Sequence, residues 1–198
     1  MKKEHRLHIW EIALLLGLLA GLLTGIWAQK TQSEIASELV RLHVLAKDDT
    51  AQEQAVKLAV RDEILRYLQP VLADAETAEE AQTVLRAHME DIRTAALTAA
   101  GERQVAVTLT EEFYPTREYD GFSLPAGEYT SLRVILADGA GQNWWCVVYP
   151  PLCMASATET AALETLSEET GNIITEQEGY VYKFKILELF GEWKEKLQ

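Results

Sequence analysis

A single uncharged stretch near the start of the chain most constrains what the chain can become. Residues 12–28 read IALLLGLLAGLLTGIWA, seventeen residues without a charged side chain. At the helical rise of 1.5 Å per residue this stretch is about 26 Å long, close to the roughly 30 Å hydrocarbon core of a bilayer. Because it is apolar on every side, we predict a membrane-targeting segment and not a helix of a protein core.

The flanks of this stretch predict its orientation. Basic residues precede it at Lys2, Lys3 and Arg6. Positive charge stays in the cytoplasm, so everything after residue 28 is expected outside the membrane. Residues 1–28 are therefore a signal peptide or an N-terminal membrane anchor. Both readings stay open, since Ala28 suits signal cleavage whereas Ile26 and Trp27 before it are bulky.

The remainder of the chain is acidic. Residues 1–28 hold three basic and two acidic residues, which leaves 15 basic and 29 acidic residues, a net charge of −14. Such a domain repels phosphate backbones and anionic lipid headgroups, so nucleic-acid binding is disfavoured. The full 198 residues suffice for one domain with a core and not for two large ones.

Two amphipathic helices are predicted after a short strand. Residues 29–38 are polar and suggest a tether, and 39–45 (LVRLHVL) form an apolar run of strand length. Thr50 and Thr77 each precede a glutamate by three residues, the capping-box pattern that begins a helix. Apolar residues then recur every three or four positions, so we expect a helix from each threonine, the second reaching Gly101.

The pattern then changes to strands. Alternating apolar residues begin at Val105, and further strands are expected at 129–137 and 144–149. The glycine-rich segment 138–143 predicts a β-hairpin that pairs these two strands. We therefore expect an α+β domain over residues 39–154, with two helices packed on a mainly antiparallel sheet.

Composition divides the rest of the chain. Residues 155–178 are rich in glutamate and hold no basic side chain, which suggests an acidic linker. Apolar residues at 179–198 first alternate and then recur with helical spacing, which predicts a C-terminal strand and helix. No repeats appear at any period.

Catalytic and metal-binding patterns are weak. His43 is either a packed strand histidine or a general base acting with Asp62 and a nucleophile such as Cys146 or Ser131. No serine or cysteine stands in a G-x-S-x-G context, and no H-E-x-x-H pair suggests zinc. The sequence therefore favours a chain without an active site, a metal, a cofactor or a small-molecule substrate.

Two short features admit more than one reading. Cys146 and Cys153 enclose the loop CVVYPPLC, and outside the cytoplasm they either form a disulfide or remain two buried thiols. Trp144 and Trp145 point to opposite faces of one strand, so one ring can join the core while the other packs or contacts a protein. Arg117 lies in YPTREY, a loop with the composition of interfaces.

Three segments resemble a known family. Residues 41–62 (RLHVLAKDDTAQEQAVKLAVRD), 113–134 (FYPTREYDGFSLPAGEYTSLRV) and 139–153 (GAGQNWWCVVYPPLC) are similar to motifs of the stage II sporulation protein R family, in the family's order. The resemblance covers roughly residues 39–154. The candidate partner contacts chosen from these motifs are His43, Asp62, Tyr114, Arg117, Tyr129, Trp144 and Trp145.

The resemblance implies a signalling role. Members of this family are made in the forespore and exported to the space between forespore and mother cell, either released or anchored, here through residues 12–28. There they activate a membrane-bound aspartic protease, which processes the mother-cell sigma factor E precursor. They are not known as enzymes, so no catalytic residues are carried over. The residues themselves leave two alternatives, an exported hydrolase using His43 and Asp62 or a passive envelope-binding module.

Overall fold

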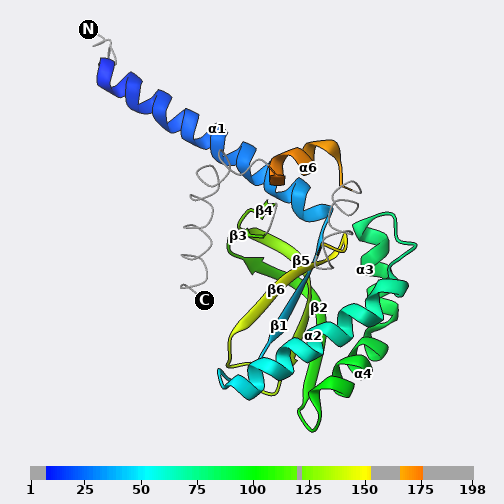
Figure 1. The fold of residues 1–198 in the computed structure, drawn as a ribbon. Coiled ribbons are helices and arrows are strands. Elements are labelled where there is room, and N and C mark those ends of the chain that lie inside the picture. Colours follow the sequence, from blue (N-terminus) through cyan, green and yellow to red (C-terminus); the bar gives the residue numbers. More distant parts are fainter. Residues whose placement is uncertain (1–7, 120–121, 153–165, 176–198) are drawn as a thin grey trace.

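The computed structural model describes residues 8–119, 122–152 and 166–175, and its fold is α+β as predicted. The helices between residues 51 and 100 lie on one side of a twisted sheet, and a long N-terminal helix projects from the body (Figure 1). The helices are α1 (Ile9–Ser37), α2 (Ala51–Val71), α3 (Ala78–Ala87), α4 (Met89–Ala100) and α6 (Glu168–Thr175). The strands are β1 (Val40–Leu45), β2 (Val105–Tyr114), β3 (Arg117–Glu118), β4 (Ser123–Leu124), β5 (Gly127–Leu136) and β6 (Asn143–Tyr149).

The main sheet has the strand order β2-β5-β1-β6. Strand β5 is antiparallel to β2 and parallel to β1, and β1 is antiparallel to β6. The predicted hairpin of β5 with β6 is therefore wrong, because β1 lies between them. All six residues of β1 are buried, as expected of a strand covered on both faces, and such a strand is most favourable inside a sheet.

The glycines that suggested the hairpin have a different role. They allow the connection from β5 to β6 to pass close to the chain that follows β1, where the Gly141 amide donates to the Ala46 carbonyl at 2.9 Å. A Cβ atom at Gly141 would collide with the backbone of Asp48. Gly139 has a φ of 64°, which glycine adopts without steric cost. The turn was correctly predicted, whereas its pairing was not.

The main apolar core lies between the sheet and helices α2, α3 and α4. Its central residues come from β1, α2 and α4, and they include Leu42, Val44, Val60, Ile64, Leu68 and Ile92. The second predicted helix is split at His88, whose φ of −105° and ψ of 14° leave the helical region between α3 and α4. The His88 ring Nδ1 lies 2.8 Å from the Tyr67 hydroxyl, which fixes the break against α2.

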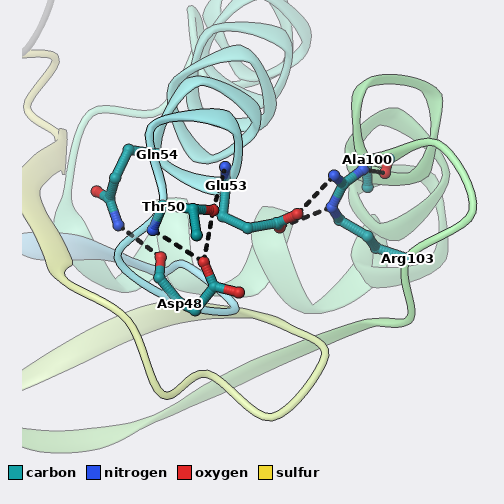
Figure 2. Close-up of polar contacts among 6 residues, drawn as sticks. All are labelled: Asp48, Thr50, Glu53, Gln54, Ala100 and Arg103. Atoms are coloured by element: carbon teal, nitrogen blue, oxygen red, sulfur yellow. Dashed lines mark hydrogen bonds and ion pairs between the residues drawn. The ribbon is translucent and has the colours of Figure 1, made fainter.

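Both predicted helix starts are confirmed, although the capping boxes are incomplete. Thr50 Oγ1 accepts from the Glu53 amide at 3.3 Å, and Thr77 caps α3 in the same way. The Glu53 carboxylate does not return to Thr50. It accepts two hydrogen bonds of 2.7 Å from Arg103, while Asp48 accepts from the Thr50 amide (Figure 2). The start of α2 is thereby tied to the chain between α4 and β2.

Helix α1 continues beyond the apolar run into the domain. The segment 29–38, predicted as a tether, is helical as far as Ser37, and its Thr31, Gln32 and Ile35 are buried. Gln32 Nε2 donates to the Glu128 carbonyl on β5 at 3.2 Å. Within the part of the chain that the structure describes, α1 is the one helix long and apolar enough to cross a membrane, a test that a signal sequence also passes.

A second apolar cluster covers part of the sheet face opposite α2–α4. It joins the end of α1 to β4, α6 and the sheet, and includes Ile35, Leu39, Phe122, Leu124, Val147, Leu166 and Ile174. Helix α6 lies within the predicted acidic linker 155–178, and Ser167 before it is bonded to Glu38. The predicted strand and helix at 179–198 lie outside the described residues.

Candidate functional site

Alternation along β1 gives the sheet a second, polar face. Leu42 and Val44 lie in the core beneath the helices, so Arg41 and His43 point the opposite way. The parallel register places Ser131 beside Arg41 and Arg133 beside His43. The polar face is defined as these four residues with Glu112, Tyr114, Arg117, Tyr129 and Trp145.

His43 is held by a carboxylate and an indole. Its Nδ1 lies 2.9 Å from Glu112 Oε1, and its ring stacks on Trp145 with centroids 5.4 Å apart. Burial raises the pKa of the Glu112 carboxyl, but the hydrogen bond to His43 and the nearby charge of Arg133 outweigh it, so the net pKa is lowered. The buried His43 Nε2 and Glu112 Oε2 have no hydrogen-bond partner in the structure.

Arg41 is fully buried in an aromatic setting. Its guanidinium carbon lies 3.9 Å from the ring centroid of Tyr114 and 5.0 Å from that of Tyr129. Nη2 donates to the Tyr119 hydroxyl at 2.6 Å. Nε and Nη1 have no hydrogen-bond partner, and no carboxylate among the described residues pairs with this guanidinium. A buried cation without a counterion is unusual, because removing the charge from water is costly.

The two buried tyrosines beside Arg41 are bonded within the domain. The Tyr114 hydroxyl lies 2.7 Å from Ser131 Oγ, and the Tyr129 hydroxyl donates to the Pro125 carbonyl at 2.7 Å. Burial raises the pKa of both phenols well above the ordinary value, although the Arg41 charge opposes this. Both rings are therefore neutral at physiological pH and do not compensate the charge of Arg41.

The margin of the polar face is more accessible. Arg117, on β3, places its guanidinium carbon 3.7 Å from the ring centroid of Trp145. The Arg133 side chain is 36% exposed, and its Nε lies 3.6 Å from Glu112 Oε1, beyond hydrogen-bond distance. Arginine stacked on a half-buried aromatic ring is typical of surfaces that bind proteins.

Comparisons with known proteins agree with the motifs of the sequence. The profile of the family described as stage II sporulation protein R (spore_II_R) matches residues 36–159, which contain the whole polar face. The chain belongs to this family. It is 33% identical over 171 residues to stage II sporulation protein R of Bacillus subtilis (strain 168), covering 83% of this chain and 76% of that protein. No solved structure matches the chain.

Five of the seven contact residues predicted from the family motifs lie on the polar face: His43, Tyr114, Arg117, Tyr129 and Trp145. The other two are on the opposite side of the sheet. Trp144 packs toward the helices, with the guanidinium carbon of Arg61 4.8 Å from its ring centroid, and Asp62 pairs with Arg61 at 2.6 Å. Their role as partner contacts stays a prediction for this member of the family.

The catalytic combination considered for the sequence is not assembled. His43 and Asp62 lie on opposite sides of the sheet, and the acidic partner of His43 is Glu112. Ser131 Oγ is bonded to Tyr114, and the register places Cys146 beside Leu42. Among the described residues no three His, Cys, Asp or Glu side chains gather as metal ligands.

Cys146 is buried and is one half of a disulfide bond. Cys153, the partner that the spacing suggests, lies outside the described residues, so this pairing stays a prediction.

Three charged residues of the polar face were not among the sequence candidates. Arg41 stands inside an otherwise apolar strand, and neither Glu112 nor Arg133 stands in a pattern that indicates a site. One signal was available for Arg41, because it lies two positions before His43 and so shares its face. The proximity of Glu112 and Arg133 depends on the sheet order, which the sequence did not predict.

Proposed function

We propose that this chain is an exported signalling protein of endospore formation that activates a membrane-embedded aspartic protease. Activation leads to processing of the mother-cell sigma factor E precursor. The chain is made in the forespore and acts in the intermembrane space, anchored by α1 or released. The observation that carries this proposal is the family match over residues 36–159, which spans the sheet and its polar face.

The connection of α1 to the domain supports action beside a membrane. The helix runs without a break from the apolar stretch into the contacts of Thr31, Gln32 and Ile35 with the domain. A membrane-inserted α1 would hold the sheet next to the bilayer surface, where the external parts of a membrane protease lie. Contact by the polar face then requires no long linker.

The proposed mechanism is differential binding and not chemistry. A ligand shifts a receptor toward its active state only by binding that state more tightly. A shift from about 1% to about 99% active requires roughly 5.5 kcal/mol of preference. A few well-packed aromatic and arginine contacts provide energies of this order at protein interfaces, and the polar face offers Arg117 and Trp145.

Co-expression in a non-sporulating host tests the function. The chain is produced with the aspartic protease and the sigma factor precursor of the same genome, and shortening of the precursor is followed by immunoblotting. We expect shortening that depends on this chain. Its absence, with all three proteins intact and correctly inserted, would refute the proposed function.

A matched pair of arginines locates the contact. Arg117 stacks on Trp145 on the polar face, whereas Arg61 stacks on Trp144 on the helical side. We expect Arg117→Ala to reduce precursor shortening and Arg61→Ala to leave it unchanged at equal protein level. The reverse result would place the contact on the helical side.

Stoichiometry separates a ligand from an enzyme. The full chain is titrated into proteoliposomes that contain the protease and the precursor. A ligand at one tenth of the receptor concentration activates about a tenth of the receptor, because each copy stays bound to one receptor. Complete activation at that ratio, given time, would favour the hydrolase alternative.

A further inference from the structure

Arg41 is the polar side chain that the described fold leaves least satisfied. It is 0% exposed, and two of its three guanidinium nitrogens, Nε and Nη1, lack a hydrogen-bond partner. An arginine side chain stays charged in proteins, so its burial cost is not removed by loss of a proton. The rings around it are neutral tyrosines, and cation–π contacts only partly replace a counterion.

The neighbouring carboxylate does not serve Arg41. Glu112 Oε1 is bonded to His43 and lies 3.6 Å from Arg133 Nε, and that Nε also has no hydrogen-bond partner. The polar face thus holds guanidinium donors without a hydrogen bond, on Arg41 and Arg133, within a chain whose net charge is −13. A local excess of positive donors in an acidic protein favours an anionic ligand at this face.

We propose that Arg41 is the centre of a carboxylate-binding site that receives an aspartate or glutamate side chain of the partner protein. The proposal rests on the proposed function for the identity of the partner, but the site itself does not depend on it. A carboxylate has the planar shape that guanidinium donors bind best, and it would accept from Nη2, in place of the Tyr119 hydroxyl, and from one of the two donors that lack partners. Binding would also supply a counter-charge, which no carboxylate among the described residues provides.

Tyr119 is the group that a ligand has to displace. Its half-buried ring lies over Arg41, with the hydroxyl on Nη2, and it follows β3 in a hairpin of only two residue pairs. Phe122 and Leu124 of this hairpin are buried, so displacement requires only the half-buried Tyr119 side chain to move. The Tyr119 hydroxyl therefore occupies the position on Nη2 that an oxygen of the bound carboxylate would take.

Acetate is the probe for this site. The full chain in non-ionic detergent micelles is heated in sodium acetate and in sodium chloride of equal ionic strength and pH, with unfolding followed by circular dichroism. We expect acetate to raise the melting temperature in a saturable way, as a ligand of the folded state does. Arg41→Met is expected to abolish the difference between the salts, and Arg61→Met, the control, to retain it.

Tyr119→Phe keeps the proposal testable even if Arg41→Met does not fold. The variant keeps the ring and removes the hydroxyl that competes with the ligand. Half-maximal stabilisation should therefore occur at an acetate concentration about fivefold lower than in the wild type, because the free energy of about one hydrogen bond no longer opposes binding. No acetate effect beyond chloride in the wild type, or an equal effect in Arg41→Met, would overturn the proposal. Stabilisation by inorganic phosphate but not acetate would overturn the assignment to a carboxylate.

The acetate experiment and the precursor-shortening experiment test the site and the signalling role separately. An acetate effect that depends on Arg41, together with no precursor shortening, would leave the site standing and refute the signalling role. Shortening without an acetate effect would leave the role standing and refute the site.

Discussion

Tyr114→Phe removes one hydroxyl from the polar face and leaves the ring over Arg41. The lost group lies 2.7 Å from Ser131 Oγ, and Tyr114 and Ser131 are both 0% exposed, so bulk water has no access to replace it. An unsatisfied buried polar group costs about 1–3 kcal/mol. We expect Tyr114→Phe to lower the free energy of unfolding by this amount.

Ser131→Ala removes the same hydrogen bond from the other side and should have a similar cost. The double variant replaces both polar groups with apolar ones, a change that is nearly neutral in favourable cases. We therefore expect it to cost less than the sum of the single variants, with a coupling energy of about 0.5–3 kcal/mol.

The cycle is measured by urea unfolding of the full chain in non-ionic detergent micelles, followed by near-ultraviolet circular dichroism, which reports packed aromatic rings. The slopes of the free energy against urea should agree among variants, so that midpoints report stability. Tyr67→Phe is the control, because the Tyr67–His88 contact is only partly buried and should cost less. Single effects that add to within about 0.5 kcal/mol would refute the reasoning.

Three further changes test other parts of the fold. Ile64→Ala opens a cavity at a fully buried core position and should cost about 2–5 kcal/mol in urea unfolding, whereas Leu58→Ala, 38% exposed on the same helix, should cost far less. Gly141→Ala brings a Cβ against the backbone that follows β1 and should lower the melting temperature by calorimetry; an unchanged value would contradict the close approach. Hydrogen bonds from Arg103 lower the pKa of Glu53, so their stabilisation is present above the ordinary carboxyl pKa and is lost as pH falls through the lowered value. Wild type should therefore lose more stability than Glu53→Gln between about pH 6 and about pH 3, measured by urea titration.

Local structure was predicted well where the signal is local. The strand at 39–45 and the helix starts at Thr50 and Thr77 follow from apolar spacing and from side chains that cap nearby amides. The break at His88 was missed because apolar spacing continues across it. At the break His88 contacts Tyr67 on another helix, which no local pattern contains.

The sheet order was not predictable from the same signals. A strand that is buried on both faces pairs equally well in many positions, and the glycines at 138–143 suit a hairpin as well as a close crossing. The choice was made by burial of β1 between β5 and β6, a long-range effect. The candidate site was likewise predictable only in part. The family motifs supplied five of its residues, whereas the positions of Glu112 and Arg133 depend on the register of the sheet.

The central position of β1 also determines when the sheet can form as the chain is made. This strand is the first to be synthesised, yet its two neighbours begin only at Gly127 and Asn143. A chain threaded through a translocation channel from its N-terminal side keeps β1 without either neighbour until most of the domain has crossed, since contacts so distant in sequence form late. Arg41 and His43 acquire their surroundings only then. A chain that still lacks β5 and β6 therefore has no assembled polar face.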